Sequence, residues 1–133
     1  GVSLYTVGSR KDVEGLGSFD AVDGGMGDNI RPALYGAKYD AVLAKDPNAP
    51  IAQNASIVGK FCESGDILIK DYDFPKTEPG DVIAMLSTGA YGYVMASNYN
   101  RNPRPAIVFV EDGKARLVVK RESYEDMIRN EIL

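Results

Sequence analysis

The residues most able to do chemistry fall into two groups. Cys62, the only cysteine of the chain, is followed directly by the carboxylate of Glu63. The second group pairs the guanidinium of Arg31 with the phenol of Tyr35, which would lie one helical turn away. A guanidinium binds a carboxylate through two parallel hydrogen bonds, and a phenol can add a third. The carboxylate of Glu63 suits an ammonium group, and Cys62 and Glu63 can both transfer protons. The two groups of residues together therefore predict a site for a small zwitterion.

Each group also has a purely structural interpretation. Pairs such as Arg31 and Tyr35 are common on helices, and spacing alone favours a surface arginine beside a half-buried tyrosine. A lone cysteine is most often a small buried hydrophobic residue, since a reactive thiol needs an exposed and tuned position. Glu63 would suit an ammonium group or stand as a solvated turn carboxylate. Neighbours on a strand face opposite ways, so Cys62 and Glu63 share a site only if the backbone turns at Ser64-Gly65.

Two glycine-rich stretches accompany these candidates. The stretch 23–28 holds three glycines, and glycine lets a ligand approach the backbone closely. The second stretch, Thr88–Gly92, contains Tyr91. A glycine-rich turn entering a helix suits phosphate, because its N–H groups and the helix dipole favour anions, but the Gly-Lys-Ser or Gly-Lys-Thr of a P-loop is missing. The alternative for Tyr91 is a core aromatic residue, which the pattern alone favours.

Composition narrows the function classes. The chain has 133 residues, which predicts one domain spanning 1–133, and its 15 basic and 19 acidic residues give a formal charge of −4. The absence of a basic stripe argues against nucleic acid, and no apolar run approaches the ~18 residues of a membrane span. With no histidine and one cysteine, a zinc site is nearly excluded and a Ser-His-Asp arrangement is excluded outright. A single cysteine fits a reducing compartment, so we expect a cytoplasmic protein.

The elements that must position these residues are mainly short strands. We expect strands over 2–9, 19–23, 37–44, 57–61, 66–72, 81–86, 106–110 and 115–119, with short helices near Pro32 and over 88–98. Asp112-Gly113 between two β-branched runs is a strong hairpin signal. Ser123 three residues before Asp126 resembles a capping box, and apolar residues at helical spacing follow as far as Ile132. The sequence therefore predicts a mainly β barrel or sandwich that ends in one amphipathic helix.

Several of these segments resemble one enzyme family. The matching strings are Asp23-Gly24-Gly25-Met26, Asp28-Asn29-Ile30-Arg31-Pro32-Ala33-Leu34-Tyr35, Cys62-Glu63-Ser64-Gly65-Asp66, Thr88-Gly89-Ala90-Tyr91-Gly92, Ser97-Asn98-Tyr99-Asn100, Arg104-Pro105, Arg121-Glu122 and Tyr124-Glu125-Asp126. In this order they resemble the C-terminal part of the diaminopimelate decarboxylase family. The resemblance covers nearly the whole chain.

The resemblance implies a fold-type III pyridoxal 5'-phosphate enzyme. Such an enzyme has an N-terminal TIM-type barrel that carries the cofactor, followed by a C-terminal β domain, and it works as a homodimer with active sites at the interface. The implied reaction is decarboxylation of meso-diaminopimelate to L-lysine. By resemblance, Arg31 and Tyr35 bind the distal carboxylate, Glu63 accepts from the distal amino group, and Tyr91 contacts cofactor and substrate. Cys62 is the implied proton donor, offered across the dimer.

The chain also departs from the family pattern. It is about a third of the expected length, so we expect the cofactor lysine to lie upstream and this chain alone to be inactive. Gly27 stands where the family usually has threonine, asparagine or serine. Two other functions stay open: a sibling decarboxylase of ornithine, arginine or a carboxylated polyamine, and a β binding module without chemistry. A binding module should satisfy its apolar strand faces, whereas a fragment should expose an apolar patch.

Overall fold

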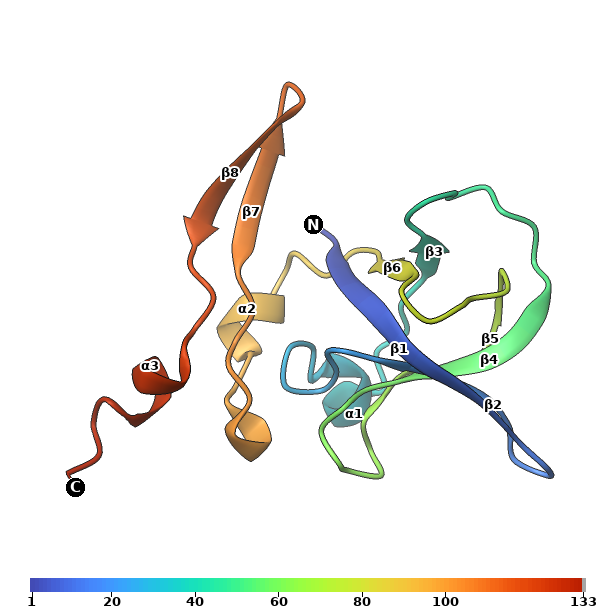
Figure 1. Ribbon diagram of the computed structural model, residues 1–133, viewed down its shortest axis with the longest axis horizontal. Coiled ribbons are helices and arrows are strands. Elements are labelled where there is room, and N and C mark those ends of the chain that lie inside the picture. The colour runs from blue at the N-terminus through green and yellow to red at the C-terminus, as the bar shows by residue number, and fades with distance from the viewer. Residues whose placement is uncertain (133) are drawn as a thin grey trace.

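The structure, a computed structural model, describes residues 1–132. Strands dominate it (Figure 1). In chain order the elements are β1 (Ser3–Val13), β2 (Gly17–Val22), α1 (Arg31–Tyr35), β3 (Ala41–Leu43), β4 (Gln53–Val58), β5 (Ile67–Phe74), β6 (Val82–Met85), α2 (Gly92–Met95), the 3₁₀ turn η1 (Tyr99–Arg101), β7 (Ile107–Glu111), β8 (Lys114–Val119) and α3 (Tyr124–Ile128). The predicted mainly β fold with short helices is therefore confirmed.

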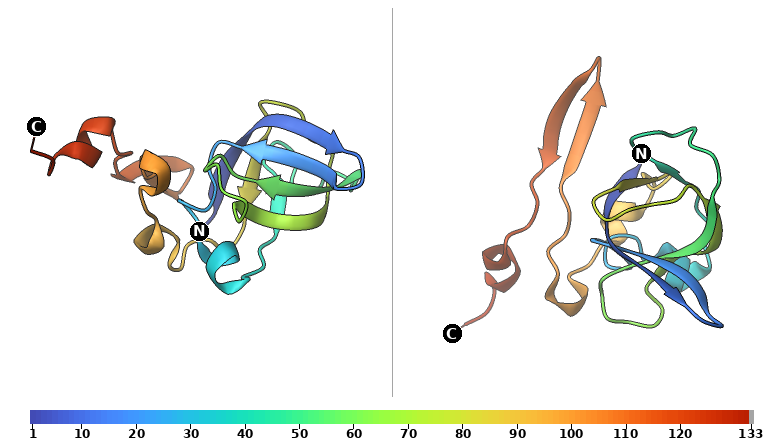
Figure 2. Two further views of the ribbon diagram at one scale, coloured as in Figure 1. Left: turned by 90° about the horizontal axis from the view of Figure 1, so that it is seen from below. Right: turned by 45° about the vertical axis from the view of Figure 1, so that its right-hand side comes forward.

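One sheet forms the body of the domain. Its strands follow the order β3-β6-β1-β2-β4-β5, and Figure 2 shows the sheet curving into a nearly closed barrel. Neighbouring strands are antiparallel except β2 and β4, which are parallel. A register shift between Val7 and Ser9 lets β1 pair with β6 along its first half and with β2 along its second. Such a bulge bends a strand, and this bend helps the sheet to curve.

The core lies inside this curved sheet. Side chains alternate along a strand, so one face of each strand can supply apolar residues to the interior. The buried cluster consists of Tyr5, Val7, Val22, Ala41, Leu43, Ile57, Leu68, Ile69, Phe74, Ile83 and Met85. Phe61 is also buried, although it lies beyond the end of β4.

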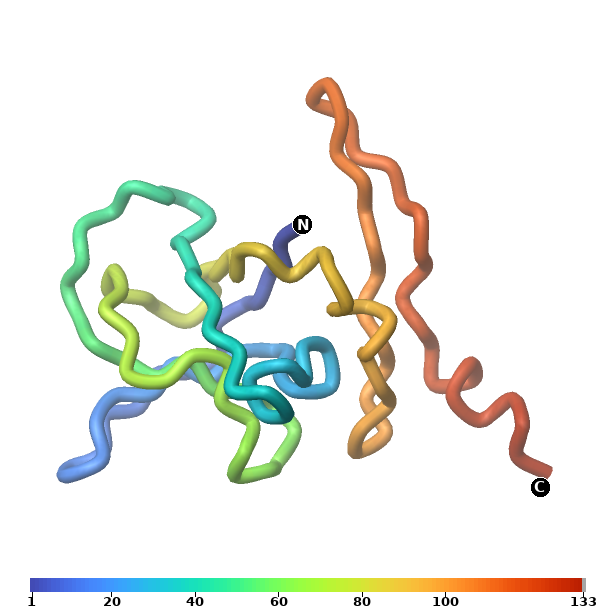
Figure 3. Tube along the Cα trace, turned by 180° about the vertical axis from the view of Figure 1, so that it is seen from behind, coloured from blue at the N-terminus to red at the C-terminus, as the bar shows by residue number. Residues whose placement is uncertain are grey.

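The hairpin of β7 and β8 stands apart from the barrel (Figures 1 and 3). Its turn is the predicted Asp112-Gly113 pair, and both residues have positive φ, as a two-residue hairpin turn requires. The hairpin exposes large apolar side chains, namely Val108, Phe109, Val110 and Leu117. An apolar patch is thus present on the surface of this chain.

Some predicted elements were wrong in extent. The predicted strand 37–44 shrinks to β3, because residues 37–40 form a loop beside α1. The predicted helix over 88–98 is only the single turn α2, consistent with glycine disfavouring a helix. The capping box of Ser123 and Asp126 is confirmed, but α3 ends at Ile128 and Ile132 is fully exposed beyond it. Within residues 1–132, no helix is long and apolar enough to cross a membrane.

Candidate functional site

Arg31 is the first residue of α1, and local contacts fix the start and end of that helix. The Arg31 N–H donates to Oδ1 of the buried Asn29 at 3.4 Å, and Pro32 occupies the first turn, where its missing N–H costs nothing. Gly36 ends the helix with a left-handed φ of 63° and donates its N–H to the carbonyl of Pro32. A single helical turn is thereby held rigidly, with Arg31 and Tyr35 on one face.

The glycine-rich turn before α1 does not leave room for a ligand. A β carbon at Gly24 would overlap the ring of Tyr5, and one at Gly27 would overlap the ring of Phe61. At Gly25 the space is filled by the carboxylate of Asp66. The expectation that these glycines admit a ligand is therefore wrong. They admit the protein's own side chains, which pack the turn against β1 and the β4–β5 loop.

The guanidinium of Arg31 lies against two aromatic rings. Its central carbon is 5.4 Å from the ring centre of Tyr35 and 5.4 Å from that of Tyr91, both within the range of a cation–π contact. Of the side chains in residues 1–132, no carboxylate forms an ion pair with Arg31. Two rings can hold the plane of a guanidinium while its edge keeps N–H donors for a partner. This is the arrangement a carboxylate ligand needs.

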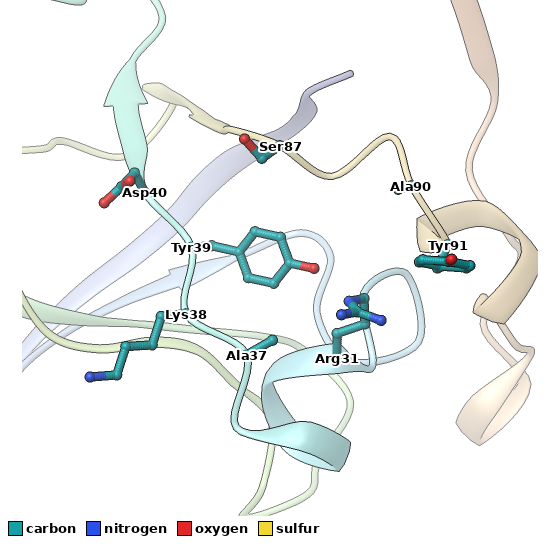
Figure 4. A pocket seen from close by; sticks show the side chains of 8 residues that line it. All are labelled: Arg31, Ala37, Lys38, Tyr39, Asp40, Ser87, Ala90 and Tyr91. Carbon is teal, nitrogen blue, oxygen red and sulfur yellow. The ribbon is translucent and has the colours of Figure 1, made fainter.

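A hollow of about 310 Å³ opens beside Arg31 and Tyr91 (Figure 4). Its lining residues are Arg31, Ala37, Lys38, Tyr39, Asp40, Ser87, Ala90 and Tyr91. The Tyr39 ring points toward Arg31, whereas Lys38 extends away from it. Sequence reasoning missed the contribution of residues 37–40 because it assigned them to a strand. The loop that follows α1 returns past the helix and forms one wall of the hollow.

Tyr91 has an exposed side chain and an unusual backbone conformation. Its side chain is 63% exposed, so the interpretation as a core aromatic residue is wrong. Its backbone has φ 65° and ψ −12° at the start of α2, a left-handed conformation that is rare for a residue with a β carbon. Such conformations persist where the surrounding structure enforces them, and they cluster at functional sites. Tyr35 is likewise 62% exposed rather than half-buried.

Cys62 and Glu63 lie on the loop between β4 and β5. Cys62 is exposed and has a left-handed φ of 54°, so the interpretation as a buried hydrophobic residue is wrong. The backbone does turn here, as a shared role for Cys62 and Glu63 requires. The turn is braced from within by Asp66, which is 4% exposed and accepts from the N–H groups of Met26 at 2.6 Å and Phe61 at 2.8 Å. Asp66 thus ties the cysteine loop to the turn before α1.

Both carboxylate oxygens of Glu63 accept hydrogen bonds. Oε1 accepts from the Gly65 N–H at 3.3 Å and from the Ser64 hydroxyl at 3.2 Å, and Oε2 accepts from the Tyr99 hydroxyl at 3.2 Å. The Gly65 N–H, followed by these two hydroxyls, holds the pKa of Glu63 below its ordinary value. Glu63 is therefore an ionised acceptor at neutral pH, ready for a cation. The contact of Tyr99 with Glu63 is a finding of the structure.

The predicted site residues form two separate groups in one chain. Arg31 and Tyr91 line the hollow and Tyr35 contacts the Arg31 guanidinium, while Cys62 and Glu63 lie on the β4–β5 loop. Among residues 1–132, the set that lines the hollow beside Arg31 does not include Cys62 or Glu63. These residues also contain no group of three or more histidine, cysteine or acidic side chains that could hold a metal ion.

Comparison with known proteins agrees with this architecture. Residues 1–89 match the family described as the C-terminal sheet domain of pyridoxal-dependent decarboxylase. Over 129 residues, 97% of its length, the chain is 60% identical to the diaminopimelate decarboxylase of Bacillus subtilis (strain 168). It spans 29% of that relative's length.

Solved structures show the same domain. The chain superposes on diaminopimelate decarboxylase from M. jannaschii in complex with L-lysine with a TM-score of 0.92 and 34% identity, covering 99% of this chain and 30% of that one. The L-lysine complex of the Helicobacter pylori enzyme gives a TM-score of 0.87 with 39% identity, covering 98% of this chain and 31% of that one. The chain therefore belongs to the pyridoxal-dependent decarboxylase family, as its C-terminal sheet domain.

Proposed function

We propose that this chain is part of a decarboxylase that converts meso-diaminopimelate to L-lysine and CO2. The observation that carries the proposal is the guanidinium of Arg31 in contact with the rings of Tyr35 and Tyr91 at the edge of a hollow. The names of the relatives support the choice of substrate, because diaminopimelate differs from a simple diamino acid by a second carboxylate. A guanidinium placed for that carboxylate discriminates against substrates without it, since they cannot form the two charge-assisted hydrogen bonds.

In this proposal Arg31 binds the distal carboxylate of the substrate. The two flanking rings fix the plane of the guanidinium, so two parallel N–H groups meet the two oxygens at little entropic cost. The Tyr35 hydroxyl adds a donor at the same end. The result is a clamp for the carboxylate that must be retained, which leaves the other carboxylate for the reaction.

Glu63 and Cys62 supply the second half of the site. The ionised carboxylate of Glu63 accepts from the distal ammonium group, and the exposed thiol of Cys62 delivers a proton to the carbon that has lost CO2. Because these residues lie away from the hollow beside Arg31 in one chain, we propose that they act across the interface of a homodimer, in the active site of the partner subunit. Cys62 is exposed on this loop, where a partner subunit could reach it.

Tyr91 is the residue of this chain that fits a bound pyridoxal 5'-phosphate. Its hydroxyl is exposed beside the hollow, where it can donate to a phosphate or to the substrate. When bound, the cofactor supplies an electron sink for the charge left on the substrate carbon. The lysine that anchors it is expected in the N-terminal barrel, so this chain alone should release no CO2 from meso-diaminopimelate and added cofactor.

A substrate panel tests the proposed function. The full-length enzyme that carries this domain is assayed for CO2 with meso-diaminopimelate, ornithine, arginine and a carboxylated polyamine. We expect turnover of meso-diaminopimelate to exceed that of each other substrate by at least about 100-fold, because the other substrates lack the carboxylate that pairs with Arg31. Faster turnover of ornithine or arginine would instead identify a sibling decarboxylase.

The alternative of a β binding module is less well supported. A self-sufficient module should cover its apolar strand faces, yet the β7–β8 hairpin exposes Val108, Phe109, Val110 and Leu117. A patch of this kind marks a surface that meets another protein surface. Light scattering separates the two ideas, because a monomer at high concentration fits the module and self-association fits a domain that lacks its partners.

A further inference from the structure

Tyr99 makes a contact that the proposed roles do not use. Its hydroxyl donates to Oε2 of Glu63 at 3.2 Å, although Tyr99 belongs to η1 and Glu63 to the β4–β5 loop. The other two donors to Glu63 come from its immediate neighbours, Ser64 and Gly65. Within residues 1–132, the Tyr99 hydroxyl is thus the only group that fixes this carboxylate relative to a different part of the fold.

The tyrosine is itself held in place. Its ring packs against the buried ring of Phe61, with 6.3 Å between the ring centres and an angle of 57° between the planes. The next residue, Asn100, donates its amide to the carbonyl of Phe61 at 2.6 Å. Before it, the N–H of Ser97 donates to the carbonyl of Gly27 at 2.9 Å. The η1 segment is therefore fastened to the barrel on both sides of Tyr99.

The cysteine loop is fastened as well. Asp66 anchors it from within, and the N–H of Lys60 donates to the carbonyl of Gly24 at 3.0 Å. The cysteine loop is held by Asp66 and Gly24, and η1 is held by Gly27 and by Phe61 at the base of that loop, so the bond between Tyr99 and Glu63 joins two fixed points. A bond between fixed points can set the direction of a side chain, whereas a bond to a mobile group only follows it.

We propose that Tyr99 is a positioning residue, whose hydroxyl orients the Glu63 carboxylate so that a free acceptor direction of Oε2 meets the ammonium group of the substrate. A carboxylate oxygen has two acceptor directions, and the phenol takes one. A phenol donates most strongly to an ionised carboxylate, so the contact also favours the charged form of Glu63. This inference rests on the proposed function of Glu63 and extends it.

The first test uses the 133-residue chain itself and needs no catalysis. The Glu63 side-chain carboxyl carbon is titrated by NMR in the native chain, in Tyr99→Phe and in Tyr124→Phe, a control at another exposed tyrosine. Tyr99→Phe keeps the ring against Phe61 and removes only the hydroxyl. We expect the midpoint of Glu63 to rise in Tyr99→Phe and to stay at the native value in the control. An unchanged midpoint in Tyr99→Phe would overturn the proposal.

The second test uses the full-length enzyme. We expect Tyr99→Phe to raise KM for meso-diaminopimelate about 3- to 10-fold, the effect of one hydrogen bond, with kcat nearly constant. In a background that already carries Glu63→Gln, the same change should have no further effect, because Tyr99 acts through Glu63. Equal losses in both backgrounds would contradict this positioning role.

The two tests separate the inference from the function beneath it. If Glu63→Gln leaves KM unchanged while the NMR midpoint moves in Tyr99→Phe, the contact is real and the proposed role of Glu63 in substrate binding fails. If Glu63→Gln raises KM while Tyr99→Phe changes neither KM nor the midpoint, the function stands and the role of Tyr99 is rejected.

Discussion

The guanidinium of Arg31 and the ring of Tyr91 lie 5.4 Å apart at the starts of two different helices, α1 and α2. The position of each residue is set by the turn that precedes it in the chain. Arg31 follows the packed glycine turn, and Tyr91 is forced into a left-handed conformation before α2. Their contact joins the barrel to the segment that leads toward the β7–β8 hairpin, and it forms one side of the hollow.

Tyr91 should show a conflict between stability and function. A left-handed backbone costs a residue with a β carbon about 1 kcal/mol, and glycine is free of that cost. We expect the free energy of unfolding of Tyr91→Gly to exceed that of Tyr91→Ala by about 1 kcal/mol, because both variants lose the ring and its contact with Arg31 and only glycine relieves the left-handed backbone. Tyr91→Ala keeps the strained backbone and should not stabilise. Urea denaturation of the three proteins measures this, and a glycine variant less stable than the alanine variant would contradict it.

Asp66 should be sensitive to loss of its charge. In Asp66→Asn, the amide group would meet one of the two backbone N–H donors of Met26 and Phe61, leaving a buried donor without an acceptor. We expect a loss of about 2 kcal/mol in the free energy of unfolding. Because Cys62 is the only thiol, its labelling rate with a disulfide reagent reports on the loop and should change in the same variant.

The control for Asp66 is Asp112→Asn in the exposed hairpin turn, where asparagine tolerates a positive φ. This variant should keep both the native stability and the native labelling rate. An Asp66→Asn variant that behaves like the control would show that the buried carboxylate does not brace the loop.

Gly27 should resist the residues that the family usually places there. A β carbon would overlap the Phe61 ring, which has no room to move because it is buried. We therefore expect Gly27→Ser to cost about 1 to 3 kcal/mol, the range for overpacking a core. In a Phe61→Leu background, Gly27→Ser should cost less stability than in the native chain, because the smaller side chain leaves room for the β carbon. Calorimetry of the native chain, the two single variants and the double variant measures this coupling. Strictly additive effects would contradict the packing explanation.

Glu122 should contribute to acid sensitivity. Its bonds to the Arg104 guanidinium, at 2.6 and 2.8 Å, lead the interactions that lower the pKa of Glu122 to about 2. A lowered pKa in the folded state means that the stabilisation is complete above the ordinary pKa of glutamate and is lost as pH falls toward 2. We expect Glu122→Gln to lose about 1 kcal/mol at pH 7 and to flatten this acid-dependent fall. A native slope between pH ~5 and ~2 in the variant would argue against the pair.

The sequence predicted the fold where local signals were strong. Alternating apolar residues, the Asp112-Gly113 turn and the Ser123 cap each act within a few residues, and each was confirmed. Predictions were wrong where distant contacts override local preference. Residues 37–40 read as a strand but pass beside α1 as a loop, and Tyr91 reads as a core residue but is exposed.

In the candidate site, too, local spacing was predictable and distant contacts were not. Helical spacing alone indicated that Arg31 and Tyr35 share a face. The placement of Tyr91 beside them depends on the path of the whole chain, which no local pattern contains. The contact of Tyr99 with Glu63 was missed for the same reason, because a tyrosine in a turn gives no sign of its distant partner. The functions of these residues remain predictions.

The substrate preference of an Arg31 variant tests the central claim most directly. In the full-length enzyme, Arg31→Gln should lower kcat/KM for meso-diaminopimelate by about 100-fold or more, because two charge-assisted hydrogen bonds are lost. Turnover of ornithine, which lacks the distal carboxylate, should fall far less, and the surface control Arg129→Gln should change neither. Equal losses with both substrates in Arg31→Gln would contradict the claim that Arg31 binds the distal carboxylate.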